Sequence, residues 1–160
     1  MSNSRKMVKL SLLLSISIVV SVAESIIPVF VPGVKLGLAN VVTLYILYSY
    51  GRKEAFLVLI VRLLLVGILR GTIFSYPFYL SVSGGLLSFV VMALIFKSKN
   101  LSIIGVSILG SLFHGIGQIL MAILLLETST IVYYLPIITA LSIPSGILTA
   151  IFARKVVSRV

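Results

Sequence analysis

PVFVPGVKLGLAN, residues 28–40, separates two apolar runs, 7–27 and 41–50, and resembles neither of them. Two prolines and two glycines lie among these thirteen residues, and both residue types interrupt a regular helix. Non-helical backbone beside a bilayer is tolerated only where protein or water satisfies its polar groups. The stretch therefore predicts a structured hairpin that caps a cavity, with the rest of the chain supplying the walls.

The composition assigns the chain to the integral membrane proteins. It has 160 residues, of which 60% are hydrophobic, and its mean hydropathy is +1.28, whereas soluble domains are about 45–50% apolar. Little sequence lies outside the apolar runs, so we expect one transmembrane domain, residues 1–160, without a soluble appendage. The first run continues to Ile27 without a small-x-small cleavage site, which favours a spanning helix over a signal peptide.

The net charge of +10 would indicate nucleic-acid binding in a soluble protein. Here the basic residues lie mostly in short segments between apolar runs, which is how membrane orientation is encoded. No nucleic-acid partner is therefore expected. The chain has no cysteine and one histidine, so we expect neither disulfides nor a metal site, and no cofactor.

The apolar runs predict an all-α membrane protein with six transmembrane helices, since a spanning helix needs about 20 apolar residues. Short polar or charged segments separate the runs. The predicted helices cover about residues 7–27, 36–50, 54–74, 80–96, 101–126 and 133–153.

The distribution of lysine and arginine predicts the orientation of these six helices. Ten cations lie on one side of the membrane, and the other side has Lys35 as its only loop cation. Cytoplasmic loops carry the excess of these residues, so both termini are expected in the cytoplasm. The ten are Arg5, Lys6, Lys9, Arg52, Lys53, Lys97, Lys99, Arg154, Lys155 and Arg159.

Ionisable side chains at membrane depth are costly, by about 2.5–3.5 kcal/mol at a helix centre, and so indicate function or pairing. The helix at 54–74 contains Arg62 and Arg70, and a spacing of eight residues places them about 80° apart, on one broad face. Glu24 lies at a depth similar to that of Arg70. These two residues form either part of a binding site or an ion pair between helices. Arg62 either serves a ligand, snorkels or caps backbone carbonyls.

Most of the polar side chains at depth gather in the outer half of the predicted bundle, which suggests a pocket with apolar walls and a few convergent polar groups. Lys35 and Arg70 favour an anionic ligand group such as a carboxylate or phosphate. We expect alanine at either position to weaken binding without preventing membrane insertion. His114, near mid-membrane, is either a pocket residue or a packing residue. The candidate substrate-binding residues are Glu24, Lys35, Asn40, Arg70, His114, Gln118 and Glu127.

Small residues recur every fourth position in three predicted helices, a spacing that allows helix backbones to approach closely. We interpret them as helix-packing positions. No internal repeat relates the two halves of the chain, so the inverted-repeat architecture of many secondary transporters is not supported. The small residues are Ser11 and Ser15, then Ser107, Ser111 and Gly115, then Ser142, Gly146 and Ala150.

Four stretches carry a resemblance to a known family: PGVKLGLAN at 32–40, the run that follows it at 41–75, SGGLLSFVVMALIFK at 83–97 and IGVSILGSLFHGIGQILMAILLLET at 104–128. Over residues 9–153 the chain resembles the Gx transporter family, whose members are labelled heptaprenyl diphosphate synthase component I. That family is similar to the S components of energy-coupling factor (ECF) vitamin transporters. The resemblance implies six helices, cytoplasmic termini, a bacterial cell membrane, an outward-facing pocket and a loop that closes over the substrate.

The resemblance also implies a function without catalysis. S components capture a vitamin-like or precursor molecule and dock on a membrane scaffold bound to two ATP-hydrolysing subunits. Their docking surface has an alanine-x-x-x-alanine motif in the first helix. The matching positions here are Ser11 and Ser15, which keep the small size and not the identity. We therefore expect a non-enzymatic, substrate-binding importer subunit for a small anionic molecule.

The synthase label can be tested against the acidic residues. Polyprenyl diphosphate synthases hold magnesium and the substrate diphosphate with aspartate-rich motifs. This chain has no aspartate, and its acids are Glu24, Glu54 and Glu127. The alternative is therefore a non-catalytic membrane partner in prenyl diphosphate or quinone metabolism, or in extracellular electron transfer. A channel is disfavoured because the inner half of the predicted bundle offers no polar path.

Overall fold

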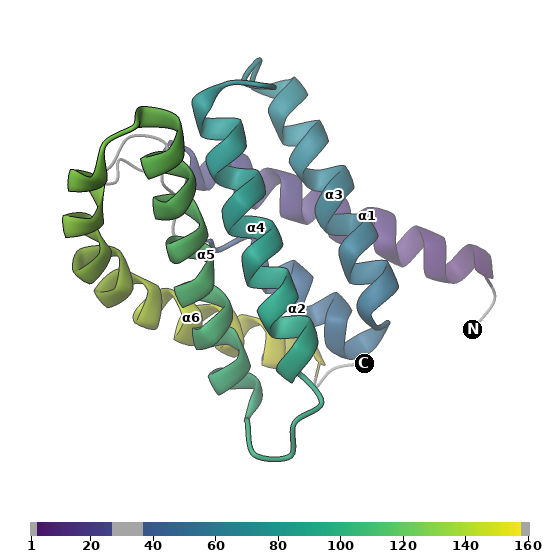
Figure 1. Ribbon diagram of the computed structural model, residues 1–160. Helices are drawn as coiled ribbons and strands as arrows, with labels where there is room; N and C mark the ends of the chain where they lie inside the picture. The colour runs from purple at the N-terminus through teal and green to yellow at the C-terminus, as the bar shows by residue number, and fades with distance from the viewer. Residues whose placement is uncertain (1–2, 27–36, 158–160) are drawn as a thin grey trace.

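The computed structural model describes residues 3–26 and 37–157, and within these ranges the regular secondary structure is all helical, without strands (Figure 1). The prediction of an all-α protein is confirmed. Most of the predicted hairpin, including Lys35, lies outside the described residues. The elements are α1 (Asn3–Glu24), α2 (Asn40–Ser49), α3 (Arg52–Leu69), α4 (Tyr76–Ile95), α5 (Ile103–Leu126), the 3-10 helix η1 (Ser129–Tyr134) and α6 (Leu135–Val157).

Four helical stretches of the described chain are long and apolar enough to cross a membrane, as expected of a membrane protein. They are Ser4–Glu24, Tyr76–Ile95, Ile103–Leu126 and Ser129–Lys155. The ten residues of α2 extend about 15 Å, which is half of a hydrocarbon core of about 30 Å. The 18 residues of α3 include four charged side chains. The count of six crossings and the cytoplasmic termini therefore stay predictions.

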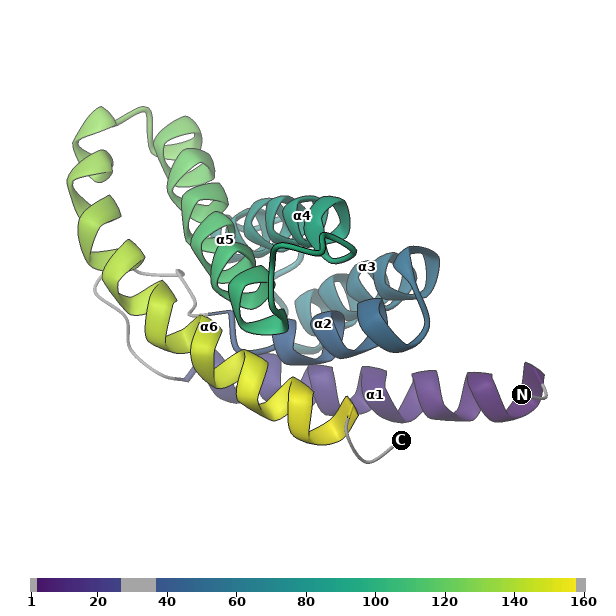
Figure 2. The same cartoon turned by 90° about the horizontal axis from the view of Figure 1, so that it is seen from below.

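The shortest α-helix, α2, lies in the middle of the molecule and contacts α1, α3, α4, α5 and α6 (Figure 2). Its side chains from Val42 to Leu47 are buried, and those of Leu44, Ile46 and Leu47 are completely so. A helix that is apolar on all sides is stable only when other protein encloses it. The role of α2 is therefore to form the core around which the longer helices pack.

The observed helix bounds differ from the predicted ones near the polar turns. The second helix begins at Asn40 and not at residue 36, because Gly37 has φ +83°, which a right-handed helix cannot contain. The third ends at Leu69 and not at residue 74. Just after its end, the N–H groups of Thr72 and Ile73 donate hydrogen bonds to the carbonyl of Gly67 and close the last turn. The fourth begins at Tyr76, four residues earlier than predicted.

The small residues of α5 and α6 face each other, which confirms their interpretation as packing positions. The Ser107 hydroxyl donates to the Gly146 carbonyl at 2.7 Å. A Cβ added at Gly146 would lie 2.7 Å from the Ile108 Cα, so the two backbones nearly touch there. Likewise, Gly115 packs directly on Ile138. Close backbone approach of this kind is how membrane helices gain packing energy.

One ion pair brings two of the basic segments to the same end of the bundle. Lys6, in the first turn of α1, donates to the carboxylate of Glu54, in the first turn of α3. The cations in the first turns of α1 and those at the start of α3 are therefore neighbours, as the predicted clustering of positive charge on one side requires.

Candidate functional site

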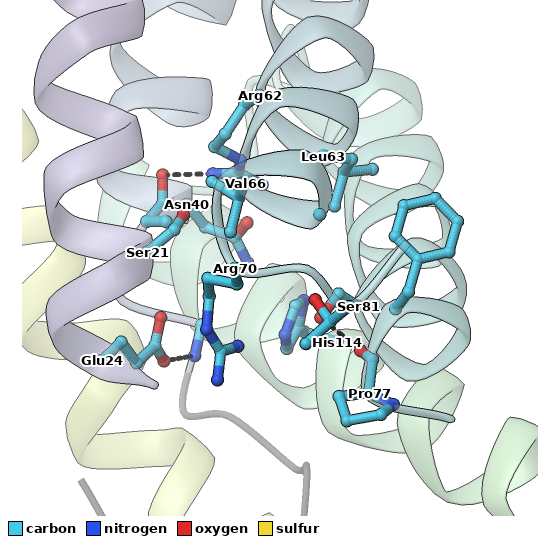
Figure 3. Close-up of a pocket in the computed structure, with 15 residues that line it drawn as sticks. Ser21, Glu24, Asn40, Arg62, Leu63, Val66, Arg70, Pro77, Ser81 and His114 are labelled. Carbon is cyan, nitrogen blue, oxygen red and sulfur yellow. Dashed lines mark hydrogen bonds between the residues drawn. The ribbon is translucent and has the colours of Figure 1, made fainter. Parts of the chain in front are cut away.

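The polar residues at membrane depth surround a cavity of about 30 Å³ at the other end of the bundle (Figure 3). The cavity lies where α1 and α3 end, where α2 and α4 begin, and beside the middle of α5. Its apolar walls include Leu63, Val66 and Phe78. Its polar lining consists of Ser21, Glu24, Asn40, Arg62, Arg70, Thr72, Ser81 and His114.

Glu24 binds the backbone that leads into α2. Its side chain is 4% exposed, and its Oε1 accepts hydrogen bonds from the N–H groups of Gly37 and of Leu38, the latter at 3.1 Å. Among the described residues no ion pair joins it to Arg70, so the helix-to-helix pair that the sequence left open is not formed there. The buried Glu24 side chain thus finds its hydrogen-bond donors in the backbone before α2.

Arg62 holds the same segment from α3. It is 4% exposed, and its Nη1 donates to the carbonyl oxygen of Ala39 at 2.8 Å. Of the three roles left open by the sequence, the structure gives it the capping of a backbone carbonyl. Glu24 is close enough to interact with it electrostatically. Two opposite charges, one on α1 and one on α3, thus fix residues 37–39 between them.

Arg70 is the second cation of the cavity. It follows the last residue of α3, is half-buried, and points into the space between Glu24 and His114 (Figure 3). Within the described part of the chain its side chain forms neither a hydrogen bond nor an ion pair. The described lining therefore contains two cations and one carboxylate, and this excess of positive charge favours an anionic group.

Asn40 and His114 connect the cavity to the helices behind it. The Asn40 amide donates to the Ser88 hydroxyl at 3.2 Å, which joins α2 to α4. His114 is 6% exposed and lies against Gly37, where an added Cβ would be 3.1 Å from the imidazole Cδ2. His114 therefore both lines the cavity and packs against the residues before α2, which combines the two roles that the sequence offered for it.

Two of the predicted binding residues do not line the cavity. Gln118 is completely buried behind it, packed against Gly84 of α4. Glu127 is exposed at the end of α5, with φ 51°. Glu127 does not line this cavity, because the thirteen residues that separate it from His114 place it about 20 Å further along the helix, and a binding role for it stays a prediction. Lys35 lies outside the described residues.

The predicted docking positions, Ser11 and Ser15, lie on the exposed face of α1. The Ser15 hydroxyl donates to the Ser11 carbonyl at 3.0 Å, within the helix. The same face presents Val8, Leu12 and Val19, each more than half exposed. Small and apolar side chains thus cover this surface of the first helix.

Several lining residues escaped the sequence analysis, and a helical spacing signals some of them. Ser21 precedes Glu24 by three residues, so both lie on one face of α1. Val66 lies midway between Arg62 and Arg70, four residues from each. Residues from the turns, such as Thr72, carry no such signal.

A metal site is a separate question. Within residues 3–26 and 37–157, no group of three or more histidine, aspartate or glutamate side chains lies close enough together to hold a metal ion.

A family model described as heptaprenyl diphosphate synthase component I matches residues 13–156. The chain belongs to that family. The match includes every cavity residue named above. Among curated proteins and among solved structures, nothing matches the chain.

Proposed function

We propose that this chain is the substrate-binding membrane subunit of an ECF-type importer and captures a small anionic molecule from outside the cell. The observation that carries the proposal is the cavity at one end of an apolar bundle, lined by Arg62 and Arg70 against a single glutamate. Convergent polar groups in an apolar concavity are the usual form of a small-molecule site. Membership of a membrane-protein family that resembles the S components supports this reading.

Capture suits the cavity better than catalysis or conduction does. Glu24 and Arg62 are both occupied with backbone groups, so their charges position the site and are not free for proton transfer. Towards the basic end, residues of α2 to α6 form one apolar cluster, with Leu47, Leu59 and Met92 among its most buried members. We therefore propose a non-enzymatic protein that transfers its substrate to partner subunits. Two of these partners hydrolyse ATP, and a membrane scaffold binds the face of α1 that contains Ser11 and Ser15.

The volume of the cavity sets a condition on this function. A cavity of about 30 Å³ has room for water, since about 10–15 Å³ suffices for one water molecule, whereas sites for larger organic ligands measure about 300–1,000 Å³. The cavity is therefore smaller than a vitamin-sized substrate, and we infer that the helix ends around it move apart when such a substrate binds. Binding then favours the open arrangement through its differential affinity for it.

Arg70→Gln tests the site. We expect a 10- to 100-fold loss of substrate affinity, because a hydrogen bond to a charged group contributes about 1.5–3 kcal/mol, with helix content unchanged because Arg70 is only half-buried. Arg154→Gln, an exposed cation on α6, is the matched control. The measurement is mass spectrometry of small molecules retained by the purified protein, compared between the variants. Equal retention by Arg70→Gln and wild type would remove the anion proposal.

A second candidate follows from the description of the family itself, which names a component of a prenyl diphosphate synthase. In that case the chain is a non-catalytic membrane partner of a soluble prenyl synthase. Co-purification separates the two. Recovery of a membrane scaffold with ATPase subunits supports the importer, whereas recovery of a soluble prenyl synthase whose activity the chain stimulates supports the second candidate.

A further inference from the structure

A second hollow, of about 340 Å³, lies at the opposite end of the bundle from the cavity described above. It is formed where α2 turns into α3 and where α4 ends, and it shares no residue with the first cavity. The side chains that give it its chemistry are Tyr48, Arg52, Lys53, Glu54, Phe96 and Lys97.

Positive charge gathers on one aromatic ring of this hollow. The Arg52 Cζ lies 5.3 Å and the Lys97 Nζ 5.7 Å from the centroid of the Phe96 ring, within the range of cation–π attraction. Two cations drawn to one ring repel each other unless an anion lies near them. Within residues 3–26 and 37–157 the only carboxylate of the lining, Glu54, is already bonded to Lys6, so Arg52 and Lys97 have no counter-ion of their own among these residues.

Uncharged donors add to this basic surface. The first turn of α3 begins in the hollow, and its preceding residue, Gly51, provides no side-chain cap. Helix N-termini of this kind bind anions through their backbone N–H groups. The hydroxyl of Tyr48 is buried without a hydrogen-bond partner in the described part of the chain, and its ring lies edge-on to Phe96 at 5.7 Å.

Apolar surface begins directly beside the cations. One turn along α3 from Arg52, Phe56 and Leu57 are 45% and 62% exposed, and Leu94 of α4, one turn before Lys97, is 72% exposed. We propose that the hollow binds the phosphate headgroup of an anionic phospholipid, whose acyl chains lie along these faces of α3 and α4. Basic pockets between membrane helices are known to select such lipids. The proposal does not depend on the importer function.

The test uses the full chain, purified in detergent and incubated with phosphatidylglycerol, phosphatidylcholine or inorganic phosphate. Native mass spectrometry counts the bound molecules. We expect wild type to retain phosphatidylglycerol in preference to phosphatidylcholine, and Arg52→Gln/Lys97→Gln to retain about 25-fold less of it, since each cation near an anionic surface contributes about fivefold. The charge-preserving variant Arg52→Lys/Lys97→Arg should keep most of the retention.

Lys99→Gln is the matched control, because Lys99 is an exposed cation in the same connection between α4 and α5 and does not line the hollow. It should retain phosphatidylglycerol as wild type does. If the double variant fails to fold, Lys97→Gln alone tests the same point, with an expected drop of about fivefold. The proposal is overturned by equal retention in variant and wild type, by equal retention of the two lipids, or by inorganic phosphate that binds as well as the lipid.

Discussion

Replacing Arg62 by methionine should lower the free energy of unfolding by about 3 kcal/mol. Arg62 is buried, donates to the Ala39 carbonyl and lies close to the Glu24 carboxylate. Methionine fills similar volume but leaves that carbonyl without its donor and the glutamate with less compensating charge. Removal of one partner from a buried charged pair typically costs about 3–5 kcal/mol. The lower end applies here because Arg70 remains in the same cavity.

A double-mutant cycle isolates the electrostatic part of this effect. Glu24→Gln keeps the shape of the side chain, and the variant that combines it with Arg62→Met should lose at least about 1 kcal/mol less than the sum of the two single changes. The chain has no tryptophan, so helix content by circular dichroism, followed during SDS titration in mixed micelles, is the measurement. Arg5→Met, an exposed cation of α1, is the control. Strict additivity would show that the two charges do not stabilise each other.

Valine at Gly117 should lower the free energy of unfolding by a similar amount, through a different cause. An added Cβ there would lie 2.8 Å from the Ser83 carbonyl oxygen and 3.0 Å from the Gly84 Cα. Both are backbone atoms that move only if α4 and α5 separate. Overpacking of a tight core costs about 1–3 kcal/mol or more, and we expect about 3 kcal/mol.

Gly105→Val provides a control within the same helix. The nearest atom to an added Cβ at Gly105 is the flexible Leu101 Cδ2, at 3.4 Å. Its effect on unfolding should stay within about 0.5 kcal/mol. The same titration in mixed micelles measures both variants. If Gly117→Val were as stable as Gly105→Val, α4 and α5 would not be in the close contact described for them.

The helical elements were largely predictable from the sequence, because apolar runs and basic connections alternate along it. The special position of α2 was not. A run that is short and apolar on all sides predicts a poor membrane helix when it is considered alone. Only the packing of five other helices around it explains why Leu44 and Ile46 can be completely buried. Backbone conformation at Gly37 and Gly71, both with positive φ, set the bounds that the sequence analysis misplaced.

The candidate site was predictable in its parts and not in its connections. Counting residues along each predicted helix placed Glu24 and Arg70 at a similar depth in the membrane, and both line the cavity. The same reasoning included Glu127, because depth alone does not show how far α5 extends beyond the cavity. The hydrogen bond from the Gly37 N–H to the Glu24 carboxylate was not predictable. It depends on where the segment before α2 lies relative to the end of α1. The period of a sequence pattern shows which side chains share a helix face, whereas a contact between segments far apart in the chain depends on the tertiary structure.

The burial of a half-length α2 also bears on how the protein reaches its membrane. A segment of ten residues is too short to be released into lipid by itself, and α3 carries charges that resist partition on their own. The tight turn at Gly51 ties the two together. During synthesis they should therefore leave the translocon as one hairpin, retained beside α1 until α4 and α5 arrive to enclose it. Biogenesis of this chain would then be a concerted event among helices and not a series of independent insertions.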